Sequence, residues 1–279
     1  MYKIIIDSCG ELTEAMKEDG HFVSVPLTLE VDEALIVDDE TFDQMDFLAR
    51  IAQSKRGSKS ACPSPEAYMN AFGGEAEHVY VVTLSASLSS SYNSAMLAVE
   101  LFKEEQGLAK QMHVFNSCSA SIGETLIGLK IQECEERGMS FKEVVAVVES
   151  YIKEQNTFFV LDNLETLRKA GRLSNIKALL ATTLQIKPVM GATPEGTIRQ
   201  LGQQRGSKKA LLQMVDKMLE VTEDYENKIL AISHCNCPER AAYVKELISK
   251  NATFKDIIVV GTQGVSTMYA NDGGVILAV

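Results

Sequence analysis

The feature that most constrains the fold is an alternation of strand-like and helix-like segments along the first half of the chain. Apolar runs at residues 2–6, 78–83 and 111–116 are rich in β-branched and aromatic side chains, as buried strands are. Helical spacing of apolar residues follows the last two runs, at 95–105 and 122–137. Strands that alternate with helices favour a parallel sheet. We therefore expect an α/β fold.

A second set of elements follows residue 155. It contains a hairpin signal around the turn at 192–196, and its remaining segments again alternate strand and helix. A chain of 279 residues can form a large core or two domains. We predict two α/β domains, residues 1–155 and 156–279, whose sheets are mostly parallel.

Three local features complete this prediction. The acidic stretch at 30–40 is typical of a surface loop. An amphipathic helix is expected over 41–54, with Thr41 as its cap. A further helix is expected over 175–184, capped by Ser174.

The composition argues against several classes of protein. The net charge of −11 argues against a nucleic-acid partner. No apolar run reaches the ~18 residues that a transmembrane helix needs, and the N-terminal stretch meets the acid Asp7 too soon for a signal peptide. The six cysteines are scattered and form neither a CxxC pair nor a zinc-site pattern, which indicates reduced thiols and a cytoplasmic location.

A cluster of serines lies between the strand at 78–83 and the helix that follows it. Ser89, Ser90 and Ser91 stand at the start of this helix, where unpaired backbone N–H groups point outward and the helix dipole is positive. Such a position suits a carboxylate or a phosphate. The alternative is that one serine is an ordinary N-cap and the others are solvated. The residues alone favour this alternative.

Four other polar residues are candidates for a site. Asp7 and Ser8 follow the first strand, where they either line a ligand crevice or cap the next helix. Ser60 precedes a stretch that two prolines stiffen. Arg172 lies between two predicted helix ends and is either solvated or an anion clamp. On the residues alone, we interpret Ser60 and Arg172 as solvated.

Signals for catalysis are missing from the sequence. No G-x-S-x-G motif surrounds Ser89, and the chain has neither a P-loop nor a dinucleotide fingerprint. The four histidines show no metal-ligand spacing, and His234 is expected to form hydrogen bonds within the C-terminal half. We predict no catalytic residue, no metal and no cofactor.

With these segments in place, the order and spacing of several short motifs resemble those of the DegV family along nearly the whole chain. The resemblance implies a two-domain α/β protein that holds one long-chain fatty acid, such as palmitate, stearate or oleate, between its domains. In one branch of the family the member presents this acid to a separate kinase, which makes an acyl phosphate. The motifs are Ile6-Asp7-Ser8, Ser60–Pro65, Ser85–Tyr92, Leu167–Ser174, Lys187-Pro188-Val189 and Ser233–Ala241.

The resemblance also implies roles for single residues. Ser60 and Ser89 stand where hydroxyls hold the carboxylate, together with the N–H groups that follow Ser89, including that of Ser90. Arg172 stands at a family arginine, and Asn271 aligns with a family histidine. The expected function is fatty-acid binding without catalysis, with a fatty acid kinase subunit as a partner.

Two other functions remain open at this point. The same donors would serve a binding module for another small anionic metabolite, and a serine-dependent enzyme is the second alternative. The shape of the site separates these possibilities. A long acid needs a deep apolar tunnel below Ser89, whereas a small metabolite needs a polar pocket.

Overall fold

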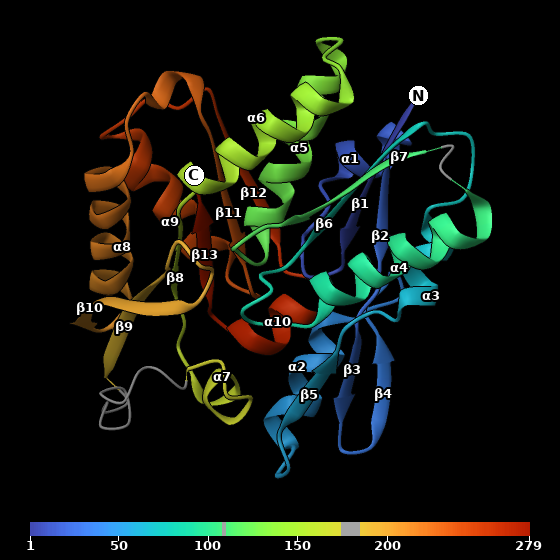
Figure 1. Ribbon diagram of the computed structural model, residues 1–279. Helices are drawn as coiled ribbons and strands as arrows, with labels where there is room; N and C mark the ends of the chain where they lie inside the picture. The colour runs from blue at the N-terminus through green and yellow to red at the C-terminus, as the bar shows by residue number, and fades with distance from the viewer. Residues whose placement is uncertain (108–109, 174–184) are drawn as a thin grey trace.

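The computed structural model describes residues 1–107, 110–173 and 185–279, and its strands form three sheets (Figure 1). Sheet A consists of four strands in the order β2-β1-β6-β7, all parallel. This sheet confirms the parallel α/β arrangement predicted for the first half. Its strands are β1 (Tyr2–Asp7), β2 (Phe22–Val25), β6 (His78–Thr83) and β7 (Gln111–Asn116).

Alternate residues of sheet A enter two separate cores, because successive strand side chains point to opposite faces. Ile4 and Ile6 pack with α1, α5 and α6, whereas Ile5 packs with α3 and α4. Helices thus cover both faces, which explains why the strands are continuous apolar runs in the sequence. The helices are α1 (Glu14–Asp19), α3 (Pro65–Ala71), α4 (Ser91–Gln106), α5 (Ile122–Glu136) and α6 (Phe141–Glu154).

Sheet C has six strands in the order β10-β9-β8-β13-β11-β12. Helices α8 (Ser207–Val221) and α9 (Pro238–Ser249) cover one of its faces and share a core with it. The strands are β8 (Thr157–Val160), β9 (Ile186–Ala192), β10 (Ile198–Arg205), β11 (Ile229–His234), β12 (Asp256–Gly261) and β13 (Val275–Ala278).

The direction of the strands in sheet C corrects the expectation of mostly parallel sheets. Only β11 and β12, which α9 connects, are parallel, and every other neighbouring pair is antiparallel. The turn at 193–197 between β9 and β10 is too short to cross the sheet, and such a connection joins antiparallel strands. The predicted hairpin is confirmed at this point.

A third sheet, sheet B, consists of β4 (Ala34–Val37), β3 (Thr28–Val31) and β5 (Ser58–Ala61), all antiparallel. The expectation of an acidic surface loop at 30–40 is therefore wrong for β4. The acidic residues on either side of β4 obscure its strand pattern in the sequence. One of these acids, Asp38, is itself buried, with 2% of its surface exposed.

The two helices that pack behind sheet B come from opposite ends of the chain. They are α2 (Gln44–Gln53) and α10 (Gly264–Ala270), which pack against each other. The expectation that Thr41 caps α2 is wrong, because the Asp43 carboxylate accepts from the N–H groups of Met45 and Asp46. The sequence analysis did not predict helix α10.

Helix α5 lies between sheets A and C (Figure 1) and contacts strands of both. Its buried residues surround the helix, as expected of an element enclosed on several sides. Gly128 permits the close approach to sheet A, because a Cβ there would lie 2.7 Å from Cδ1 of Ile6. The strands of sheets A and B precede residue 155 and those of sheet C follow residue 156. The domain boundary itself stays a prediction.

Two further short helices are α7 (Glu165–Lys169) and a 3-10 helix, η2 (Tyr225–Asn227). The predicted helix over 175–184 and its cap Ser174 lie outside the described residues. Within the described ranges, no helix has the length and apolar character that crossing a membrane requires.

Candidate binding site

A cavity of about 350 Å³ lies at the carboxyl edge of sheet A, where sheet C and α10 close it. Its size falls within the range of about 300–1,000 Å³ that is usual for small-molecule sites. The loops that follow β1, β6 and β7 line it from one side, and Phe159, Leu161 and Ile276 of the C-terminal half line it from the other. Ligands commonly bind at the carboxyl ends of parallel strands.

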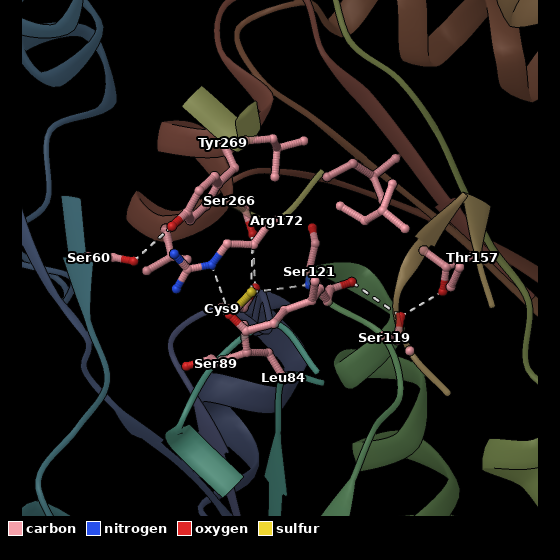
Figure 2. Close-up of a pocket in the computed structure, with 18 of the residues that line it drawn as sticks. Cys9, Ser60, Leu84, Ser89, Ser119, Ser121, Thr157, Arg172, Ser266 and Tyr269 are labelled. Carbon is pink, nitrogen blue, oxygen red and sulfur yellow. Dashed lines mark hydrogen bonds between the residues drawn. The ribbon is translucent and has the colours of Figure 1, made fainter. Parts of the chain in front are cut away.

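One end of this mainly apolar cavity combines a charged side chain with several hydroxyls. Figure 2 shows Ser60, Tyr269, Arg172 and Ser89 together there, with Ser119 and Thr157 on the opposite side. Among the lining residues that the structure describes, Arg172 carries the only formal charge. We call this end, formed by Ser60, Ser89, Ser90, Arg172 and Tyr269, the head end. The Arg172 cation suits an anionic group at the end of an apolar molecule.

One buried carboxylate holds both ends of the loop that carries Ser89 and Ser90. The Asp7 Oδ2 atom accepts from the Leu84 N–H at 3.0 Å and from the Ser91 hydroxyl at 2.5 Å. Asp7 is fully buried, and it neither caps α1 nor lines the cavity, so both of the predicted roles for it are wrong. It fixes the loop that forms part of the cavity wall.

The start of α4 confirms that the serines stand at a helix N-terminus. Ser90 occupies the N-cap position, but its side chain makes no capping bond. The Ser89 hydroxyl instead accepts from the Ser91 N–H at 3.2 Å. Because this bond uses only an acceptor lone pair, the Ser89 proton remains able to donate to a ligand.

Arg172 is held in place by two backbone carbonyls. Its Nε donates to the Leu88 carbonyl at 3.0 Å, and its Nη1 donates to the Ala170 carbonyl at 2.5 Å. Both the Leu88 and the Arg172 side chains line the cavity. The interpretation of Arg172 as a solvated residue is therefore wrong, since the side chain is half-buried in the cavity wall.

Asn271 lies outside the cavity lining. Helix α10 ends at Ala270, and the positive φ of 54° at Asn271 turns the chain away. The amide of Asn271 lies 3.4 Å from the carbonyls of Met268 and Tyr269, whereas its neighbour Ala270 lines the cavity. The structure thus brings four of the five predicted residues together and leaves Asn271 apart. Their contact with a ligand stays a prediction.

The sequence missed several polar lining residues. Tyr269 and Ser266 lie on α10, which had no clear helical pattern. Across the cavity, the hydroxyls of Ser119 and Thr157 lie 2.6 Å apart (Figure 2). The serine-rich composition of the turn after β7 is a signal that could have identified Ser119. Tyr269, the one aromatic residue between β12 and β13, is a signal that could have been used.

Below the cavity lies a group of acids that we call the buried acid cluster: Asp7, Glu11, Asp38 and Glu124. Each is at most 2% exposed, and none forms a salt bridge within the described residues. Burial raises the pKa of Glu11 to about 7 and that of Asp38 to about 6. Burial also raises the pKa values of Asp7 and Glu124. Desolvation is the largest cause of each shift, because it penalises the charged form of a buried carboxyl group.

Part of this cluster has the composition of a metal site. Asp7, Cys9 and Glu124 place ligand-type atoms within 4.8 Å of one another. However, the two oxygens of Asp7 already accept three hydrogen bonds, from Cys9 N–H, Leu84 N–H and the Ser91 hydroxyl. Glu124 has no donor to either oxygen within the described residues, which favours its protonated form. We interpret Asp7, Glu11 and Asp38 as acceptors of buried hydrogen bonds from hydroxyl and backbone N–H groups around them.

The head-end serines Ser60 and Ser89 have no base beside them within the described residues. Neither a histidine nor a carboxylate is among the described lining residues of the cavity. His234 lies at the end of β11, where its Nδ1 accepts from the Cys237 N–H at 3.3 Å. This confirms the local role expected for His234. A serine-dependent enzyme needs a base within hydrogen-bond reach of the nucleophile. Within the described residues, neither Ser60 nor Ser89 has a histidine or carboxylate partner, whereas the Ser121 hydroxyl donates to the buried Glu11 carboxylate at 2.8 and 2.9 Å.

Two α/β halves that enclose an apolar cavity with the Arg172 cation at its end define a binding site for an amphipathic anion. Comparison with known proteins then identifies the family. The model of the DegV family, described as uncharacterised proteins, matches residues 1–278. The chain belongs to the DegV family, and the resemblance seen in the sequence is confirmed.

Similar proteins match over essentially the whole length. A DegV domain-containing protein of Streptococcus pneumoniae is 33% identical over 278 residues, which are 99% of this chain and 98% of that protein. The crystal structure of a DegV family protein from Ruminococcus gnavus with vaccenic acid is 53% identical, with a TM-score of 0.97, and the match covers 100% of this chain and 99% of that one. The fatty acid kinase (Fak) B3 protein of Streptococcus pneumoniae, loaded with linoleic acid, is 32% identical, with a TM-score of 0.88 and coverage of 100% and 98%.

Proposed function

We propose that this protein binds one long-chain fatty acid, with the carboxylate at the head end and the tail along the apolar cavity. The observation that carries the proposal is the composition of the wall, in which apolar side chains predominate and Arg172 is the only charged residue described. The ligands named for the Ruminococcus gnavus and Streptococcus pneumoniae structures support it. The structure offers an apolar cavity rather than the polar pocket that a small metabolite would need.

The two ends of the ligand contribute differently. Burial of a tail is worth about 0.8 kcal/mol per CH₂, so roughly 14 methylenes give about 11 kcal/mol before the cost of ordering the ligand is subtracted. The carboxylate gains less, because it exchanges water for protein donors. Ser60, Ser89 and the N-terminus of α4 supply donors, and Arg172 supplies the charge. The tail therefore dominates affinity, and the head end sets orientation. Palmitate, stearate and oleate are ligands of suitable length.

We also propose that the protein presents the bound acid to a separate kinase and does not itself catalyse the reaction. The similarity to the Fak B3 protein supports a role beside a kinase. The absence of a P-loop from the sequence is consistent with a partner that binds the nucleotide. The proposed location is the cytoplasm, which the six free cysteines support.

Native mass spectrometry of the purified protein, followed by identification of any released molecule, tests the binding function directly. We expect a stoichiometric long-chain fatty acid. Delipidated protein should take up oleate and should bind its methyl ester more weakly. A protein that neither carries nor takes up fatty acids would contradict the proposal. Uptake of a small anionic metabolite instead would then support the alternative binding module.

A further inference from the structure

Tyr269 meets Ser60 at the head end although the two residues lie 209 positions apart in the sequence. The Ser60 hydroxyl and the Tyr269 hydroxyl are 3.1 Å apart (Figure 2). Ser60 comes from strand β5 of sheet B, and Tyr269 comes from helix α10. Within the described residues, Tyr269 is the only hydrogen-bond partner of the Ser60 hydroxyl.

The phenol ring of Tyr269 is fixed from two sides. It packs against the core cluster that includes Leu29 and Phe47 and also against the cluster that includes Leu167 and Met190. A ring held between two cores has little freedom, so its hydroxyl occupies a defined position. The Ser60 side chain, in contrast, is unbranched and half-buried on a short strand, and its hydroxyl can adopt several rotamers.

Counting protons shows what the pair can offer to a ligand. Two hydroxyls carry two protons, and their mutual hydrogen bond uses one. A phenol is the more acidic hydroxyl, with a pKa of about 10, and is therefore the better donor. When Tyr269 donates to Ser60, the Ser60 proton is left to donate to a third group. A hydroxyl that accepts one hydrogen bond also becomes a stronger donor in the next.

We propose that Tyr269 is a positioning residue for ligand recognition: it donates to Ser60 and orients the Ser60 O–H toward the carboxylate of the bound acid. This inference rests on the proposed function. It adds a residue for which the sequence analysis gave no role. It also makes carboxylate recognition depend on the contact between sheet B and α10, because the two partners come from these separate elements.

A double-mutant cycle with Ser60→Ala, Tyr269→Phe and the combined variant tests this role. The affinity of delipidated protein for oleate is measured for each, together with the affinity for methyl oleate. We expect Tyr269→Phe to raise the Kd for oleate by about 3- to 10-fold, the size of one hydrogen bond. The change for methyl oleate should be smaller. The combined variant should bind like Ser60→Ala, since Tyr269 acts through Ser60.

Tyr225→Phe serves as a matched control. The Tyr225 hydroxyl donates to the Leu219 carbonyl at 3.1 Å, and the residue lies outside the cavity lining. This variant should bind oleate like the wild type, and melting curves check that all variants are folded. Additive losses in the combined variant, or an unchanged Kd in Tyr269→Phe, would overturn the inference alone. A wild-type protein that binds no fatty acid would overturn the proposed function as well.

Discussion

The head end and the buried acid cluster are two polar regions of one molecule with opposite designs. The head end combines one cation, Arg172, with hydroxyls and a helix N-terminus, and no acid lines it in the described part of the chain. The buried acid cluster contains four carboxyl groups, none of which forms a salt bridge among the described residues. The head end keeps donors directed into the cavity, whereas the acids of the cluster accept hydrogen bonds from neighbouring buried groups. The difference separates residues that recognise a ligand from residues that hold the walls in place.

Replacing Asp7 should produce the largest effect. Asp7→Ala leaves the buried Leu84 N–H and the Ser91 hydroxyl without their acceptor. We expect the free energy of unfolding to fall by about 3 kcal/mol, since each unsatisfied buried group costs roughly 1–3 kcal/mol. Urea denaturation measures the change. The exposed Asp46→Ala is the control, and an equal loss there would argue that the buried cluster has no special structural role.

Removing the positive charge of the head end should produce the second-largest effect. Arg172→Ala is expected to weaken binding of oleate by about thirtyfold, or about 2 kcal/mol, the scale of a hydrogen bond to a charged group. Binding of methyl oleate should change much less. Isothermal titration calorimetry measures both ligands, with exposed Arg137→Ala as the control. An equal loss for acid and ester would mean that Arg172 only supports the wall.

The Arg172→Ala variant also tests the proposed role beside a kinase. If a kinase partner phosphorylates the bound acid, negative charge develops near Arg172, and the cation stabilises it. Arg172→Ala should then abolish turnover even at oleate concentrations that saturate the variant. Acyl phosphate formation in a coupled assay with a fatty acid kinase subunit is the measurement. Normal turnover at saturation would remove Arg172 from that step.

The buried acid cluster should make stability depend on pH. The fold raises the pKa of Glu124 above its ordinary value of 4.5, so the neutral form is stabilised. Its contribution to stability is complete below the unfolded pKa and is lost as the pH rises toward the folded pKa. Glu11, with a pKa of about 7, acts in the same direction. The free energy of unfolding should therefore decline from about pH 4.5 upward, by up to about 1.4 kcal/mol per pH unit for each group.

The Glu124→Gln variant measures how much Glu124 alone contributes to the fall of the free energy of unfolding with rising pH. The amide keeps the shape of the side chain and can donate to Asp7, as the protonated acid can, but it does not ionise. The variant should show a shallower decline than the wild type and should be the more stable of the two at alkaline pH. Denaturation series at several pH values measure the slope, and exposed Glu75→Gln should leave it unchanged. A slope unaltered in Glu124→Gln would show that Glu124 is already charged in the folded protein.

Asn271→Ala should have the smallest effect. Its amide faces carbonyls at the end of its own helix, and the side chain lies outside the cavity lining. We expect the Kd for oleate to stay within about twofold of the wild-type value, because no contact with the ligand is lost. A loss of affinity as large as that of Arg172→Ala would mean that Asn271 contacts the ligand at the head end. The C-terminal end of α10 would then have to differ from the one described.

The sequence predicted sheet A well because both of its faces are buried. Strands covered on both sides are uninterrupted apolar runs, and β1, β6 and β7 have this pattern. Prediction failed where burial is partial. Strand β4 is surrounded by acids, and α10 is rich in glycine, serine and threonine, so neither shows a clear period. The antiparallel order of sheet C also escaped prediction, because strand direction depends on which strands become neighbours.

The sequence by itself determined the local parts of the site: a serine-rich turn before α4, a stiff segment beside Ser60, and an arginine just beyond the end of α7. Those features follow from neighbouring residues, and their order along the chain resembles one family. Only the tertiary structure decided that Ser60, Ser89 and Arg172 share one cavity end, that Tyr269 joins them, and that Asn271 does not. The physical reason is that long-range packing of α10 and sheet C against the first half sets these distances. No local pattern contains that information.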